Sequence, residues 1–304
     1  MRLVVVGAGA IGATIAWHLA RAGHDVGVVD VRRDHLEAIA RDGLVAEPSG
    51  EAVRVDTEPG PEPPAELVVV ATKAFATEEA ARGASHLVGE ETLVATVQNG
   101  IGTEDVLAEV FGAERVLSGT TTIAAEAGAA GRVRIGESTR AGRSLTVLGC
   151  PPGAPGLLAR VEVLCAAFTD AGLPASAVVD AAPARWRKLA FAGSMGALSG
   201  LLDATVGETL ASAPEVLLAL IDEIVAVAQA EGVALDRDET RAAALAVFAD
   251  TGFHRASLAV DLAEGRRTEI DALCLEVVRR GAAHGVPTPV NDVVGRLVSA
   301  RERR

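Results

Sequence analysis

Short apolar runs alternate with amphipathic helical patterns over the first half of the chain. Runs of this length, rich in valine and leucine, are typical of strands buried on both faces of a sheet. Strands that alternate with helices predict a parallel, doubly wound α/β sheet. The predicted strands are residues 3–6, 26–29, 53–55, 67–70, 92–97, 116–125, 132–135 and 144–148, and the helices among them are residues 11–22, 35–42, 77–87 and 156–171.

The pattern changes near residue 180, beyond which only helical periodicity is found. A chain of 304 residues is longer than one hydrophobic core usually fills, so we expect two domains. We place a sheet domain at residues 1–180 and an all-helical domain at residues 181–304. The helices predicted in the second domain are residues 186–201, 214–231, 238–249, 256–264, 269–284 and 290–300.

A G-x-G-x-x-G sequence joins the first strand to the first helix. In this context Gly7 permits the tight turn, Gly9 lets a pyrophosphate approach the backbone, and Gly12 lets the helix pack closely on the strand. Ala10 and Ile11 open the helix, whose free N–H groups are donors for phosphate oxygens. The sequence therefore predicts a dinucleotide-binding domain of the Rossmann type.

Asp30 ends the second predicted strand, where an acidic residue accepts hydrogen bonds from the adenosine ribose. Its charge would repel the 2′-phosphate of NADP, so we expect NAD to be the preferred cofactor. Arg32 and Arg33 follow closely and keep NADP as the alternative.

Composition narrows the class of protein further. Hydrophobic residues make up 49% of the chain and charged residues 23%, as in a globular enzyme. The net charge of −13 makes nucleic acid an unfavourable partner. The three cysteines form no C-x-x-C pair and no metal-ligand cluster, so we expect no metal site and a reducing, cytoplasmic location. No run of bilayer length lacks charge, and we expect no membrane partner.

Several motifs along the chain resemble those of the ketopantoate reductase family, and the resemblance runs nearly end to end. W-x-K-L at residues 186–189 and T-E-I-D at residues 268–271 are the most specific of them. The resemblance implies that a reduced nicotinamide transfers hydride to the ketone of a 2-oxo acid, giving a 2-hydroxy acid. The other matching segments are residues 7–12, 72–74, 98–102 and 119–122.

The same resemblance implies roles for individual residues. Hydride addition to a carbonyl leaves an alkoxide that needs a proton donor and a nearby positive charge, and Lys188 would supply both. Glu269 would be its acidic partner, and Ser257 would bind the substrate carboxylate. Asn99 would hold the nicotinamide end of the cofactor and face the substrate, and Lys73 would lie against the cofactor ribose. The alternative for Lys188 and Glu269 is a solvated helix start and a surface ion-pair cluster.

The substrate pocket departs from the family pattern. The family carries asparagines four and eight residues after the lysine, on one helix face, where this chain has Ala192 and Gly196. His254, three residues before Ser257, is a further candidate for the substrate site, with an ordinary surface histidine as the alternative. We therefore expect a reductase with altered substrate choice.

Two other functions remain open from the sequence. One is a true ketopantoate reductase of pantothenate biosynthesis, and the other is a nucleotide-binding protein without catalysis. Whether the chain forms a homodimer is also left open.

Overall fold

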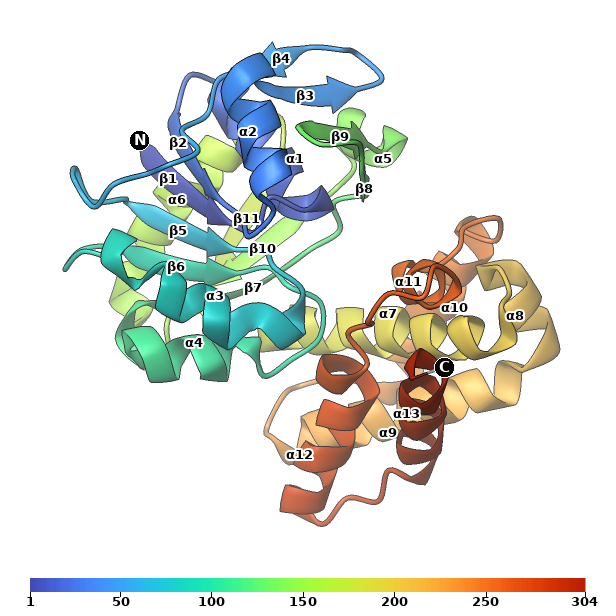
Figure 1. Ribbon diagram of the computed structural model, residues 1–304. Helices are drawn as coiled ribbons and strands as arrows, with labels where there is room; N and C mark the ends of the chain where they lie inside the picture. The colour runs from blue at the N-terminus through green and yellow to red at the C-terminus, as the bar shows by residue number, and fades with distance from the viewer. Residues whose placement is uncertain (304) are drawn as a thin grey trace. The chain divides into compact units, whose positions relative to one another are not determined.

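The computed structural model describes residues 1–303, which divide into two compact units (Figure 1). The first unit contains Met1–Gln98 and Thr103–Ala181. The second contains Asn99–Gly102 and the chain from Ala182 onward. The short segment Asn99–Gly102 thus packs with the helices, although it lies within the predicted sheet domain by sequence.

A seven-stranded sheet forms the centre of the first unit (Figure 1). It is parallel, as expected, except that β10 runs antiparallel to β7. β11 in turn pairs parallel to β10 at the edge. The strands, in spatial order, are β11 (Ala175–Val178), β10 (Thr146–Gly149), β7 (Val116–Thr121), β6 (Leu93–Thr96), β5 (Leu67–Val70), β1 (Arg2–Val6) and β2 (Asp25–Val29).

Both faces of this sheet are covered, which explains its continuous apolar strands. In β1, Leu3 and Val5 pack with the apolar residues of α1 (Ala10–Arg21) and α6 (Leu158–Asp170). The alternate residues Val4 and Val6 pack on the other face, with α3 (Thr77–Gly83) and α4 (Thr103–Phe111). All four side chains are at most 3% exposed, so neither face of the strand tolerates a polar residue.

A second sheet of four strands packs on α1 and was not predicted. Its order is β4 (Ala52–Val53), β3 (Leu44–Glu47), β9 (Arg132–Ile135) and β8 (Ala125–Ala127). The single strand predicted at residues 116–125 was wrong, because the chain leaves the large sheet after Thr121 and joins the small one at Ala125.

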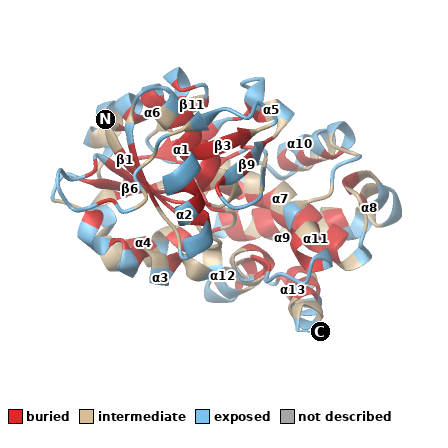
Figure 2. Ribbon diagram, turned by 45° about the horizontal axis from the view of Figure 1, so that its top comes forward, coloured by how far each residue is buried: buried red, intermediate tan, exposed pale blue. Residues whose placement is uncertain are grey.

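The second unit is helical, with its apolar residues gathered in one buried cluster (Figure 2). Its long helix α7 packs against α9 and α11, and Gly200 permits the close approach to α11 because a Cβ there would lie 2.9 Å from Leu258. No single helix within residues 1–303 is long and apolar enough to cross a membrane; the bent pair of α7 and α8 meets that test by length and composition only. The helices are α7 (Ala182–Leu202), α8 (Val206–Ser212), α9 (Pro214–Ala230), α10 (Arg237–Asp250), α11 (Ser257–Ala263), α12 (Glu276–His284) and α13 (Pro289–Glu302).

The helix predicted at residues 269–284 begins differently in the structure. Glu269 precedes a π-helical turn, η5 (Asp271–Leu275), and α12 follows it. Within η5, Leu273 has non-helical dihedrals of φ −98° and ψ −105°. Such π-turns are frequent at functional sites, and this one adjoins the catalytic candidate Glu269.

Candidate active site

The glycine-rich turn has the geometry that its motif predicts. Gly7 has φ +96°, and a Cβ on it would lie 2.7 Å from the backbone nitrogen of Thr72. A Cβ on Gly12 would lie 1.9 Å from the Gly7 carbonyl oxygen. Both positions therefore exclude a side chain for reasons internal to the fold.

Gly9 differs, because nothing lies within 4 Å of the position its Cβ would occupy. It caps α1 without a side-chain hydrogen bond, and the first helical bond runs from the nitrogen of Ala13 to its carbonyl. The N–H groups of Ala10, Ile11 and Gly12 precede that bond and point out of the helix. Open space at Gly9 beside these donors fits a bound pyrophosphate.

Asp30 is held in place beside this turn. Its Oδ2 accepts from the backbone nitrogen of Ala8 at 2.8 Å, and its Oδ1 accepts from the Arg32 nitrogen at 2.9 Å and from Nε at 3.1 Å. Burial acts to raise the pKa of this carboxyl, but the hydrogen bonds from Arg32 and Ala8 outweigh it and hold the pKa below its usual value. The carboxylate is thus charged and oriented at the carboxyl end of β2.

Gln98 ties together two neighbouring strand ends in the same unit. Its Nε2 donates to the Thr72 carbonyl at 2.8 Å and to Thr77 Oγ1 at 3.0 Å. Its Oε1 accepts from Thr96 Oγ1 at 3.0 Å. The predicted ribose contact Lys73 follows Thr72 directly and begins the short helical turn Ala74–Ala76. Gln98 belongs to a matched motif, but this role was not predicted from the sequence.

The second unit brings together three candidates from distant parts of the sequence. The Lys188 ammonium donates to Asn99 Oδ1 at 2.9 Å, and Asn99 Nδ2 donates to Glu269 Oε2 at 3.3 Å. Lys188 lies in the second turn of α7, and Glu269 is only 7% exposed. The side-chain amide thus links the cation to the carboxylate.

Burial lowers the pKa of the Lys188 ammonium to about 8. The Glu269 carboxylate acts to raise it, and the positive charge of Arg185 acts to lower it further. A lysine with a pKa near neutrality can give up its proton and regain it during turnover. Such perturbed groups are concentrated at active sites.

A small cavity of about 50 Å³ adjoins this network. Its polar walls include three of the sequence candidates, Asn99, Glu269 and Ser257, the last at the start of α11. Asp261, which the sequence reasoning missed, lies one turn after Ser257 and is held by Arg266 Nη2 at 2.8 Å. Its spacing of four residues from Ser257 was the available signal. The apolar walls are Ala192, Leu258 and Leu273.

Three further candidates, Lys188, Gly196 and His254, are not among the residues that line this cavity. Gly196 is buried against α11, where its Cβ would meet only the Leu258 side chain at 3.4 Å. His254 is exposed, and its carbonyl accepts from the backbone nitrogen of Val206. Ala192 is thus the member of the predicted pair that faces the cavity.

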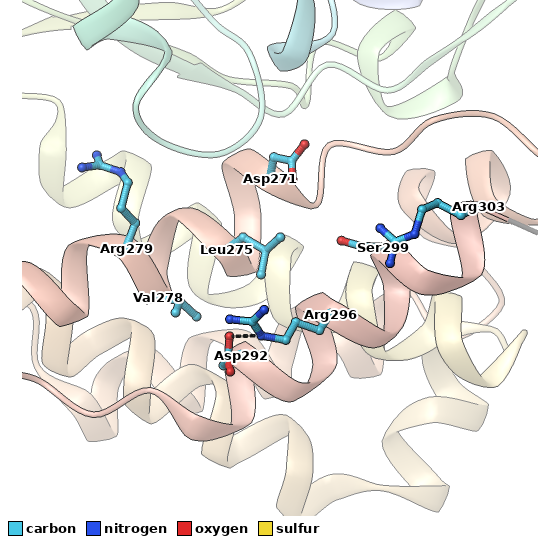
Figure 3. A pocket seen from close by; sticks show the side chains of 8 residues that line it. All are labelled: Asp271, Leu275, Val278, Arg279, Asp292, Arg296, Ser299 and Arg303. Atoms are coloured by element: carbon cyan, nitrogen blue, oxygen red, sulfur yellow. Dashed lines mark hydrogen bonds and ion pairs between the residues drawn. The ribbon is translucent and has the colours of Figure 1, made fainter.

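A larger groove of about 590 Å³ lies along α12 and α13 (Figure 3). Figure 3 shows Arg296 paired with Asp292, at 2.7 Å, and the Arg279 and Arg303 side chains beside the same groove. The three arginines are exposed and Asp292 is partly exposed, and no general acid candidate is among them. The sequence candidates Asn99, Ser257 and Glu269 line the smaller cavity instead.

A glycine-rich dinucleotide turn, together with a helical unit that carries a Lys–Asn–Glu network, defines an NAD(P)-dependent oxidoreductase. The chain belongs to the ketopantoate reductase family. Residues 3–152 match the family model for ketopantoate reductase PanE/ApbA, and residues 180–302 match the model for its C-terminal part. It is accordingly an NAD(P)H-dependent 2-oxo acid reductase.

Relatives and solved structures agree with this assignment. The chain is 34% identical to the 2-dehydropantoate 2-reductase of Halobacterium salinarum, over 100% of this chain and 99% of the relative. A D-mandelate dehydrogenase solved with NADH and anilino(oxo)acetate is 27% identical with a TM-score of 0.91, covering 100% and 98% of the two chains. A ketopantoate reductase from Ralstonia eutropha is 31% identical with a TM-score of 0.86, covering 100% and 99%.

Proposed function

We propose that this protein is an NADH-preferring reductase of a 2-oxo acid whose side chain is larger or less polar than that of ketopantoate. The observation that carries the proposal is the methyl group of Ala192 in the wall of the cavity, where the family pattern places an asparagine. An amide lost there removes a hydrogen-bond partner for a substrate hydroxyl, and the space gained favours apolar surface.

The preference for NADH rests on Asp30. Its carboxylate is charged and fixed by Ala8 and Arg32, so it can accept from a free ribose 2′-hydroxyl and repels a 2′-phosphate. Arg32 is already bonded to that carboxylate and to the Ala8 carbonyl, at 3.0 Å from Nη2. Its guanidinium therefore stabilises the charged Asp30 carboxylate and is not directed toward a 2′-phosphate.

The proposed proton donor is Lys188. When bound, the reduced nicotinamide supplies the hydride to the carbonyl carbon. Lys188 gives a proton to the carbonyl oxygen, so that one hydride and one proton convert the ketone to the alcohol. Asn99 orients the ammonium, and Glu269 stabilises its charged form through that amide and by proximity. Ser257, which lines the cavity, is the proposed donor to the substrate carboxylate.

The D-mandelate dehydrogenase structure supports the substrate class, because that protein was solved with NADH and with anilino(oxo)acetate, a 2-oxo acid analogue bearing an aromatic group. The identity of 34% to assigned 2-dehydropantoate 2-reductases favours the second candidate, a true ketopantoate reductase. The third, a nucleotide-binding protein without catalysis, has no use for a lysine whose pKa is lowered toward neutrality.

The test is a steady-state comparison of 2-oxo acids with NADH and with NADPH. The panel should include ketopantoate, short aliphatic 2-oxo acids, branched ones and phenylglyoxylate. We expect NADH with a bulky or aromatic 2-oxo acid to give the highest kcat/KM. If ketopantoate proves best, the second candidate holds, and tight cofactor binding without turnover of any member would establish the third.

A further inference from the structure

We propose that Arg185 is a positioning residue of this active site, which fixes the Asn99–Gly100 segment and places a second positive charge one helical turn from Lys188. This inference rests on the proposed role of Lys188 as the proton donor. It concerns a residue outside the matched motifs, on the N-terminal side of the W-x-K-L sequence.

The first support is the position of Arg185 itself. It lies in the first turn of α7, three residues before Lys188, and is only 5% exposed. Cations are disfavoured near a helix N-terminus, where the backbone dipole is positive, and α7 has no acidic residue in its first turn. A buried arginine at this place costs stability, so a role at the adjacent site explains it better than packing does.

The second support is the contact that Arg185 makes. Its Nη2 donates to the Gly100 carbonyl oxygen at 3.3 Å. Gly100 has φ +87°, and a Cβ on it would lie 2.2 Å from the Ala272 carbonyl oxygen. That same oxygen accepts from the backbone nitrogen of Ile101 at 3.1 Å. The peptide group that joins Gly100 to Ile101, directly after Asn99, is therefore held at its carbonyl by Arg185 and at its nitrogen by η5.

The third support is electrostatic. The charged groups that act on the Lys188 ammonium are Glu269, before η5, and Arg185 on α7 itself. Asp261, on α11 in the wall of the adjoining cavity, is paired with Arg266. The Glu269 carboxylate favours the protonated lysine, whereas Arg185 favours proton release. Opposed charges of this kind can bring the pKa of a proton donor close to the pH at which the enzyme works.

The chain offers a direct readout of this charge, because Lys73 and Lys188 are its only two lysines. In a Lys73→Arg background, protein grown on lysine labelled with ¹³C at Cε gives one lysine signal, that of Lys188. Its chemical shift can be followed with pH in the absence of substrate and cofactor. We expect a titration midpoint near the pKa of about 8.

In that background, Arg185→Leu and Arg185→Gln should each move the midpoint to higher pH by about one pH unit, since each removes a nearby positive charge. Arg187→Gln, which removes an exposed charge from the same helix, is the matched control and should leave the midpoint in place. An unmoved midpoint in a folded Arg185 variant, or an equal movement in the Arg187 variant, would overturn the proposal.

Kinetics test the positioning part. Arg185→Leu should lower kcat about tenfold or more and move the alkaline limb of the pH profile of kcat to higher pH. Arg185→Lys keeps the positive charge and should return that limb to its wild-type position. A loss of thermal stability alone, with an unchanged pH profile, would show a merely structural role. The titration needs no turnover, so failure to find any 2-oxo acid substrate would refute the proposed function while the inference about Arg185 is still decided.

Discussion

The Lys188 ammonium donates a hydrogen bond to the Asn99 side chain at 2.9 Å, although the two residues are 89 positions apart in the sequence. Asn99 directly follows Gln98, which belongs to the sheet unit, and packs with the helices that carry Lys188. Lys188, the proposed proton donor, is thus held by a segment that directly follows the sheet unit in the sequence.

Replacing Lys188 with alanine should lower kcat by roughly 10²–10⁴-fold, the range typical for loss of a general acid. The dissociation constant for NADH should change little, because the glycine-rich turn belongs to the other unit. Steady-state kinetics and a fluorescence titration of NADH measure the two quantities. Arg187→Ala is the matched control, since this neighbour is exposed and should leave kcat near the wild-type value. A Lys188→Ala enzyme with wild-type kcat would exclude Lys188 as proton donor.

The rate of ketone reduction should fall as the pH rises through about 8, where Lys188 loses its proton. The reverse reaction, oxidation of the 2-hydroxy acid, should rise over the same interval because it needs the neutral amine. The sign follows from burial, which lowers the pKa of this lysine from its usual value of 10.5. Profiles of kcat/KM in both directions check it, and two profiles that move in the same direction would contradict the assignment.

Asp30→Asn should reduce the preference for NADH over NADPH by about tenfold or more, because it removes a charge that faces the ribose 2′-position. The amide oxygen can still accept from Ala8, so the turn should keep its shape. The ratio of kcat/KM for the two cofactors is the measurement. Asp34→Asn, an exposed acid in the first turn of α2 (Arg33–Asp42), is the control. A wild-type enzyme that prefers NADPH more than about tenfold would mean that Arg32 or Arg33 decides the site.

Gly9→Ala and Gly12→Ala should separate cofactor binding from folding. A methyl group on Gly9 meets no protein atom within 4 Å but stands where the pyrophosphate approaches, so NADH affinity should fall about tenfold or more while the Tm is kept. A methyl group on Gly12 would lie 1.9 Å from the Gly7 carbonyl oxygen, so the Tm itself should fall. Thermal unfolding without cofactor and an NADH titration distinguish them. Equal losses of Tm in both variants would refute the distinction.

Ala192→Asn should raise kcat/KM for ketopantoate and lower it for bulky apolar 2-oxo acids, by several-fold each, because it exchanges a cavity methyl for an amide. Gly196→Ala is the matched control on the same helix, since its methyl would meet Leu258 at an ordinary 3.4 Å outside the cavity lining. Relative kcat/KM values for the two substrates report the change. If only the Gly196 variant alters the ratio, Ala192 does not shape the pocket.

The sequence by itself determined the parallel sheet, the helical second half, the glycine-rich turn and the candidates for the reacting groups. These features depend on local spacing: period-two and period-3.6 patterns, a fixed interval of glycines, and short motifs such as those at Lys188 and Glu269. The structure confirmed the fold class they predicted. Short, partly exposed strands such as β4 and β8 carry too few residues for such a pattern, so the small sheet escaped prediction.

Only the tertiary structure decided which of those groups meet. The anchoring of Gly100 by Ala272, the bond from Asn99 to Glu269 and the burial of Arg185 depend on packing between segments remote in sequence. Local spacing gave Ala192 and Gly196 the same helix face, but packing against Leu258 separates them, so that only Ala192 lines the cavity. The lowered pKa of Lys188 has the same origin, because desolvation and neighbouring charges exist only in the folded chain.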